Sequence, residues 1–365
     1  MPNYAAQGQA VGGVEANTGY SVSVIGSYGK IFKHTQRFEP TITEPSQVYE
    51  LYLGRHTAGK RLWEELIGYP VVGLSLIHAR FGDADIFGQA LGLMPSLAFQ
   101  TRRKHWSLNY RIGIGLAYLN NPYDLFNNPT NNVIGSNWNN ITQLAVFAEG
   151  NLHPKWHLIG MFSFTHFSNG RTQAPNLGIN VPAVGLGLRY LPQPPTIKTA
   201  RIPRDSLPQY DHKFHAGLKI GHGFTDGEPV GGPKYPVYVL QAYVAKRVAT
   251  QWQLLAGIES NYYASIYYYN INQGNWAGQE AKRAFKIAPY IGGELFMGRF
   301  SFVGTAGYYA YNPDFTRGIV PTKIGLQYYA FPTYTRVGRQ LYWGIYLKAH
   351  FSVADYVEVG MGYTF

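Results

Sequence analysis

Apolar and polar residues alternate along most of the chain with a period of two. In the segment 105–118, the even positions carry Trp, Leu, Tyr and Ile, whereas the odd positions after His105 carry Ser, Asn, Arg, Gly and Ala. The segments 212–222 and 284–297 alternate in the same way. This period is typical of β-strands with one apolar face and one polar or small face. Aromatic residues stand at both ends of the apolar row of 105–118, as in the interfacial girdles of membrane barrels.

About sixteen segments show this alternation, and a count of fourteen also fits their boundaries. We place them at about 18–33, 47–57, 69–81, 88–101, 105–118, 141–152, 155–168, 181–191, 212–223, 235–248, 251–264, 284–297, 299–312, 322–331, 340–351 and 354–365. Long connections, such as 119–140, alternate with short turns, such as 153–154. Bacterial outer-membrane barrels show this asymmetry between external loops and periplasmic turns.

The pattern therefore predicts an all-β fold, a transmembrane antiparallel β-barrel. No window reaches the roughly 18 consecutive apolar residues that a membrane helix requires. We expect one barrel of about sixteen strands rather than two tandem eight-strand barrels, because a single closed sheet leaves no edge in lipid. A wider interior would also suit the charged residues that the alternation assigns to the lumen, namely Arg111, Glu149, Lys219, Glu259, Glu294 and Lys348.

The two halves of the chain resemble each other. The segment 106–124 parallels 300–315, and the tripeptide His-Phe-Ser occurs at 166–168 and again at 350–352. A tandem duplication of an eight-strand unit explains both similarities. We expect a first half over 1–191, a Pro-rich linker over 192–211, and a degenerate second half over 212–365 that completes the barrel.

The composition of the chain limits the classes of protein and of partner that fit the sequence. Charged residues make up 14% of the 365 residues, against about 25% in soluble domains. The absence of cysteine excludes disulfides, thiolate nucleophiles and Cys-ligated metals. The formal net charge of +11 favours an acidic partner such as a phosphorylated glycolipid, and no basic helix or stacking motif supports nucleic acid. Residues 1–20 lack the basic start and apolar run of a secretory signal, so we expect a processed chain.

The candidate chemistry lies in the segment 155–168. Its apolar even row changes at its outer end to His166 and Ser168, which should therefore face the bilayer near the external interface. Residues two apart on a strand are about 6.6 Å apart, a gap that an imidazole can span. A serine beside a base is an activated nucleophile in outline, and a nucleophile facing lipid points to a lipid ester. The bare pair equally fits polar residues that meet headgroups and water.

The wider stretch 165–180, "THFSNGRTQAPNLGIN", resembles the active-site segment of the outer-membrane lipid A 3-O-deacylases. The resemblance implies an eight-strand barrel of a Gram-negative outer membrane with a Ser-His-Glu arrangement on its lipid face. It implies lipid A, or lipopolysaccharide, as the substrate, with no cofactor or metal. Ser168 and His166 match the nucleophile and the base of the family. Asn169, Gly170 and Asn176 match its oxyanion-hole region.

The sequence departs from the family at Asn180, where the family has Glu. An amide can accept a hydrogen bond but supplies no charge, and in serine proteases an Asp→Asn change costs about 10⁴ in turnover. Three alternatives remain open. The activity is weak, or another carboxylate such as Asp83 or Asp85 completes the site, or the site is inactive.

Two further features bear on function. His78 and Arg80 lie on the apolar parity at the outer end of their strand, where they either contact lipid phosphates or simply end the strand. The second His-Phe-Ser lies on the opposite parity, so His350 and Ser352 should face the lumen as a relic. We expect a serine esterase acting on lipid A. The alternatives are a non-catalytic structural or docking subunit that binds other outer-membrane proteins and, more weakly supported, a pore.

Overall fold

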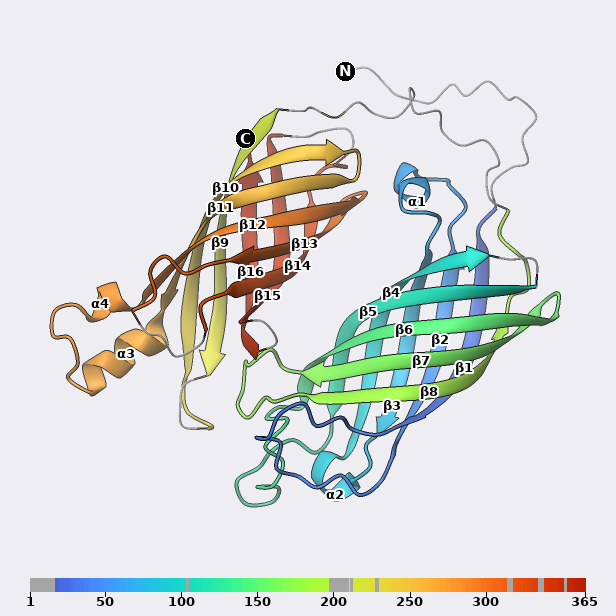
Figure 1. Cartoon of the computed structure of the whole chain (residues 1–365), viewed down its shortest axis with the longest axis horizontal. Coiled ribbons are helices and arrows are strands. Elements are labelled where there is room, and N and C mark those ends of the chain that lie inside the picture. Colours follow the sequence, from blue (N-terminus) through green and yellow to red (C-terminus); the bar gives the residue numbers. More distant parts are fainter. Residues whose placement is uncertain are drawn as a thin grey trace.

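The computed structural model describes residues 17–102, 105–196, 210, 213–226, 230–313, 318–333, 338–350 and 353–365. Within these ranges the chain forms sixteen strands and four short helices (Figure 1). The strands are β1 (Gly19–Gly29), β2 (Ser46–His56), β3 (Val71–Arg80), β4 (Gln89–Arg102), β5 (Trp106–Leu119), β6 (Trp138–His153), β7 (Trp156–Ser168), β8 (Ile179–Tyr190), β9 (Phe214–Asp226), β10 (Lys234–Ala249), β11 (Trp252–Tyr263), β12 (Phe285–Met297), β13 (Phe300–Gly307), β14 (Pro321–Tyr329), β15 (Gln340–His350) and β16 (Val353–Thr364). The helices are α1 (Leu62–Leu66), α2 (Ala84–Phe87), α3 (Ala264–Asn272) and α4 (Glu280–Arg283).

None of the helices in these ranges combines the length and the apolar character needed to cross a membrane.

The expectation of a single sixteen-strand barrel is wrong. The strands form two closed eight-strand barrels, β1–β8 and β9–β16, which Figure 1 shows as separate cylinders. The first barrel closes where β1 pairs with β8, from Val22 opposite Tyr190 to Gly29 opposite Ala183. The second closes where β16 pairs with β9. Because both edges of β8 are already paired, no edge remains for a ladder to β9.

The lumen-facing charges do not require a wide interior, because most of them form ion pairs and Glu294 accepts hydrogen bonds from Gln253, Ser301 and Tyr329. Arg111 Nη2 lies 2.7 Å from Glu50 Oε2 in the first barrel, and both side chains are almost fully buried. In the second barrel, Lys219 Nζ lies 2.7 Å from Glu358 Oε1, also buried. Charges of opposite sign in direct contact compensate much of the cost of their burial. Two narrow barrels can therefore hold the charges that the sequence pattern assigned to one wide barrel.

The alternation along the strands separates an exposed outer face from a buried interior. In β5 the outward row is exposed, whereas Asn109 and Arg111 on the inward row are buried. Apolar side chains form a core at the end of the first barrel where the β1–β2, β3–β4, β5–β6 and β7–β8 connections lie. This core includes Phe81, Phe87 and Phe167. It anchors the end of the barrel at which β7 reaches His166 and Ser168.

The linker predicted over 192–211 lies mostly outside the described residues, which include only 192–196 and 210 of it. The two barrels on either side of it span Gly19–Tyr190 and Phe214–Thr364.

Candidate active site

His166 and Ser168 lie together on the outward-facing row of the first barrel, at the end of β7, where Ser168 is 8% exposed and His166 is half-buried. The Ser168 Oγ is 2.9 Å from His166 Nε2, within hydrogen-bonding distance. Between them, Phe167 is fully buried in the apolar core and meets Phe81 edge-on, with ring centroids 5.3 Å apart. Because side chains alternate along a strand, burial of Phe167 inside the barrel turns its two neighbours outward. The core thereby fixes the face on which the serine and the imidazole meet.

Asn180 makes the second hydrogen-bonding contact of the His166 imidazole. It lies on β8 directly opposite His166 in the β7–β8 ladder, and its Oδ1 is 2.7 Å from His166 Nδ1. Ile179 and Val181 are fully buried on either side of it, which turns the amide outward. Asn180 thus stands where the third group of a nucleophile–base–orienter arrangement would stand.

Neither of the carboxylates considered as a substitute contacts His166. Asp83 instead accepts hydrogen bonds from the backbone N–H and the hydroxyl of Thr43, at 3.2 and 2.5 Å. The backbone carbonyl of Asp85 accepts a hydrogen bond from Asn121. Across the described ranges, no carboxylate oxygen forms a hydrogen bond with His166. The orienting group of this site is therefore an uncharged amide.

One residue of the site has no signal in the sequence pattern. His34, in the connection after β1, places its Nδ1 2.8 Å from Asn180 Nδ2. The backbone N–H of Phe32 also donates to the carbonyl of Asn180, at 2.8 Å. These contacts exist because β1 pairs with β8. In a single sixteen-strand barrel β1 would pair with β16, so the sequence analysis had no reason to bring His34 to the site.

The segment after Ser168 forms a compact loop held by amide side chains. The Asn169 backbone N–H donates to Asn176 Oδ1 at 3.0 Å, and the Asn169 side-chain amide donates to Ser136 Oγ at 2.9 Å and to the Gln173 carbonyl at 2.7 Å. Within the ranges that the structure describes, neither the Gly170 backbone N–H nor Asn176 Nδ2 makes a hydrogen bond. The Gly170 N–H is buried and the Asn176 amide is half-buried, whereas the donors of Asn169 are committed to the loop.

Two glycines permit the tight course of the loop. Gly170 has φ +62° and Gly178 has φ +82°, which non-glycine residues rarely adopt. A Cβ at Gly178 would lie 2.7 Å from His166 Cε1, so the absence of a side chain lets the chain pass directly beside the imidazole. The Pro-Asn-x-Gly pattern of the sequence signals this turn.

The loop also contacts the second barrel. Asp226, at the end of β9, accepts a hydrogen bond from the Ala174 backbone N–H at 2.6 Å, and its side chain is buried. A Cβ at Gly170 would lie 2.5 Å from Val357 Cγ2 on β16. The second barrel therefore packs directly against the segment that follows Ser168.

His78 and Arg80 do not join this group. They lie on β3, and four strand steps separate β3 from β7 in either direction around the barrel. His78 Nε2 instead lies 2.9 Å from Gln89 Oε1, and its ring stacks on Tyr49. Their proposed contact with lipid phosphates stays a prediction, at a place remote from Ser168.

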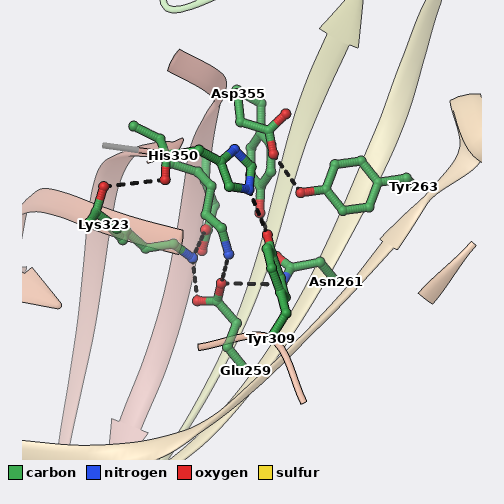
Figure 2. A network of polar contacts seen from close by, with 12 residues as sticks. Glu259, Asn261, Tyr263, Tyr309, Lys323, His350 and Asp355 are labelled. Carbon is green, nitrogen blue, oxygen red and sulfur yellow. Dashed lines mark hydrogen bonds and ion pairs between the residues drawn. The ribbon is translucent and has the colours of Figure 1, made fainter. Parts of the chain in front are cut away.

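The second barrel turns its corresponding histidine inward. His350 is 7% exposed, and its Nε2 lies 3.0 Å from the hydroxyl of Tyr309 (Figure 2). Ser352 lies outside the described residues. Asp355, the nearby carboxylate, accepts a hydrogen bond from the Tyr263 hydroxyl at 2.6 Å. His350 is thus part of an interior network and does not reach the outer surface.

Comparison with known proteins assigns each barrel to a related family model. Residues 47–189 match the model described as lipid A 3-O-deacylase (PagL), and residues 209–365 match the model described as acyloxyacyl hydrolase, C-terminal domain. No curated protein matches the chain. The crystal structure of the outer membrane enzyme PagL is similar at 15% identity and a TM-score of 0.32, covering 45% of this chain and 97% of that chain. The β domain of the Bordetella autotransporter BrkA is similar at 10% identity and a TM-score of 0.25, covering 96% and 99%.

Proposed function

Because the chain belongs to the lipid A 3-O-deacylase family, as a tandem relative with one family model on each half, we propose that its first barrel hydrolyses an acyl ester of lipid A through Ser168. The chain is a β-barrel protein of the Gram-negative outer membrane. The observation that carries the proposal is the 2.9 Å contact between Ser168 Oγ and His166 Nε2 on the outer surface of that barrel. A nucleophile in this position meets acyl chains of the outer leaflet without leaving the membrane.

The reaction follows from the contacts of each group. His166 Nε2 accepts the proton of Ser168 while Oγ attacks the ester carbonyl carbon. The resulting oxyanion requires donors that are not already engaged. We assign this role to the Gly170 N–H and Asn176 Nδ2, which make no hydrogen bond within the described ranges. His166 then donates its proton to the leaving sugar hydroxyl, and water releases the fatty acid from Ser168 in a second, equivalent step.

We expect Asn180 to limit the turnover of this reaction. Its Oδ1 can hold the Nδ1–H of His166 and so leave Nε2 free as the base. It supplies no negative charge to stabilise the imidazolium that forms after proton transfer, which a carboxylate would do. We therefore expect slower turnover than in a relative with Glu at this position.

The test is Ser168→Ala in the full-length chain, produced in a Gram-negative host whose lipid A lacks any other deacylase. Mass spectra of lipid A should show loss of one acyl chain with the wild-type protein and the intact form with the variant. Ser352→Ala, the serine of the second His-Phe-Ser, is the matched control and should leave the deacylated species in place. Identical spectra for wild type and Ser168→Ala would reject the esterase.

The replacement of the carboxylate by Asn180 favours one alternative, a barrel that has lost catalysis and serves as a docking subunit for other outer-membrane proteins. In that case lipid A would be unchanged on deletion of the gene, and stable partners would co-purify with the barrel from solubilised membranes. Deacylation by the wild-type protein and not by Ser168→Ala excludes this alternative as the sole function.

A further inference from the structure

The amide of Asn180 lies between two imidazole rings. Its Oδ1 is 2.7 Å from His166 Nδ1, and its Nδ2 is 2.8 Å from His34 Nδ1. Each ring nitrogen of a neutral histidine is either a donor or an acceptor, depending on the tautomer. An amide has one accepting end and one donating end. The contacts from Ser168 to His34 therefore form a chain that can run with either of two polarities.

Only one polarity supports hydrolysis. When His34 Nδ1 accepts from Asn180 Nδ2, the amide oxygen faces His166, whose Nδ1 carries the proton and whose Nε2 is free to take the proton of Ser168. When the amide is reversed, its NH₂ faces His166 Nδ1, which must then be the acceptor. The proton of His166 then resides on Nε2, and the ring cannot act as base. This wrong tautomer is the cause of the large loss in serine proteases whose Asp is changed to Asn.

We propose that His34, in the tautomer protonated on Nε2, is a positioning residue that sets this polarity by accepting from Asn180 Nδ2, and that it compensates for an amide where the family has a carboxylate. A carboxylate presents oxygen at both ends and needs no such partner. An amide needs a partner that fixes its orientation, because one end accepts a hydrogen bond and the other donates. The inference rests on the proposed function for its consequence in catalysis, whereas the tautomer it predicts for His166 exists with or without hydrolysis.

The surroundings of His34 make it suited to a test by substitution. Its ring is exposed, so its replacement empties no core. The backbone around it is held separately, because Phe32 N–H donates to the Asn180 carbonyl at 2.8 Å and β1 pairs with β8 through Gly29. Substitutions at position 34 can therefore change the hydrogen-bonding character of this side chain without opening the barrel.

The first experiment compares three variants of the full chain on purified lipid A in detergent micelles. His34→Ala removes the acceptor and should lower kcat by about 100-fold, the lower end of what a correctly protonated base contributes. His34→Glu can only accept and should retain activity near that of the wild type. His34→Lys can only donate, draws the amide oxygen away from His166, and should lose the most. Equal losses for all three variants would indicate a purely structural role and overturn the proposal.

The same substitution in an Asn180→Glu variant separates an effect on the orientation of the amide from an effect of charge at position 34. In Asn180→Glu both ends of the orienting group are oxygens, so His34→Ala should cost less than about threefold in kcat there. A general electrostatic effect of position 34 would persist in that background at its original size. Persistence of the full loss would therefore contradict the assignment of His34 as the group that orients an amide.

The third measurement is independent of hydrolysis. In Ser168→Ala protein with ¹⁵N-labelled histidine, two-bond nitrogen–proton spectra should show His166 protonated on Nδ1. Adding His34→Lys should move the proton to Nε2. An unchanged tautomer would reject the inference even if the esterase is active, and a changed tautomer would support it even if lipid A is never cleaved.

Discussion

The two barrels carry the same tripeptide at the outer end of a strand and use it in opposite ways. In the first barrel His166 lies on the outer face beside Ser168, because Phe167 occupies the apolar interior. In the second barrel His350 shares the inward row with Lys348 and Tyr346, both nearly fully buried. A strand has only two faces, so a shift of one residue moves a side chain from lipid to lumen.

The interiors differ as much as the exteriors. The outer end of the first barrel is packed with Phe, Ile and Val side chains. At the same level the second barrel holds Lys323 and Lys348 against Glu259, with tyrosine hydroxyls around them (Figure 2). Where the interior is apolar, the polar residues of this end point to the outward row, as Ser168 and Asn180 do. Where the interior is polar, as in the second barrel, the polar side chains of this end bond to one another.

The largest expected difference between the barrels is in catalysis. His166→Ala removes the only base that contacts Ser168 within the described ranges, and deacylation should fall by up to about 10⁶-fold, the loss seen when the serine or the histidine of such a pair is removed. His350→Ala removes the matching histidine of the second barrel and should change the rate by less than about threefold. The rate of fatty acid release from lipid A in micelles measures both. Comparable losses would place the second barrel in the chemistry and end the contrast.

The next difference is in stability. Lys323 lies 2.5 Å from both Glu259 and Glu358, so Lys323→Met leaves buried carboxylates short of a partner and should cost about 3–5 kcal/mol of unfolding free energy. The exposed Lys246, which stacks over Phe214, is the control, and Lys246→Met should cost less than about 1 kcal/mol. Urea midpoints of the protein in detergent measure both. Equal midpoints would show that the interior network contributes little to the second barrel.

The smallest expected effect lies at the contact between the barrels. Asp226→Ala removes the acceptor for the Ala174 N–H and should lower kcat/KM by about fivefold, the value of one hydrogen bond of about 1 kcal/mol. Asp226→Asn retains an acceptor and should stay within about twofold of the wild type. A rate unaffected by Asp226→Ala would mean that the first barrel works without support from the second.

The sequence predicts the local features of this protein and not its closure. Alternation in 105–118 and 155–168 gives the strands and the outward parity of Trp106 or Phe162, because that parity follows from the period of a strand. Which strand closes on which depends on pairing between β1 and β8, about 150 residues apart, and no local pattern encodes it.

The error about closure and the omission of His34 have one cause. The motif around Ser168 points to His166 and Asn180 through a resemblance, since these residues lie within one hairpin. His34 reaches them only across the β1–β8 seam. Asp226 was likewise beyond sequence reasoning, because it belongs to the other barrel and its contact with the first is to a backbone N–H. Partners within a hairpin can be found from spacing, whereas partners across a seam require the assembled sheet.

Each barrel seals itself with its own first and last strand, β1 with β8 and β9 with β16. This has a consequence for inheritance. An exchange of coding sequence within the linker would leave each ring of strands complete, with no unpaired strand edge. Such an exchange would cost only the packing of the second barrel against the loop that follows Ser168.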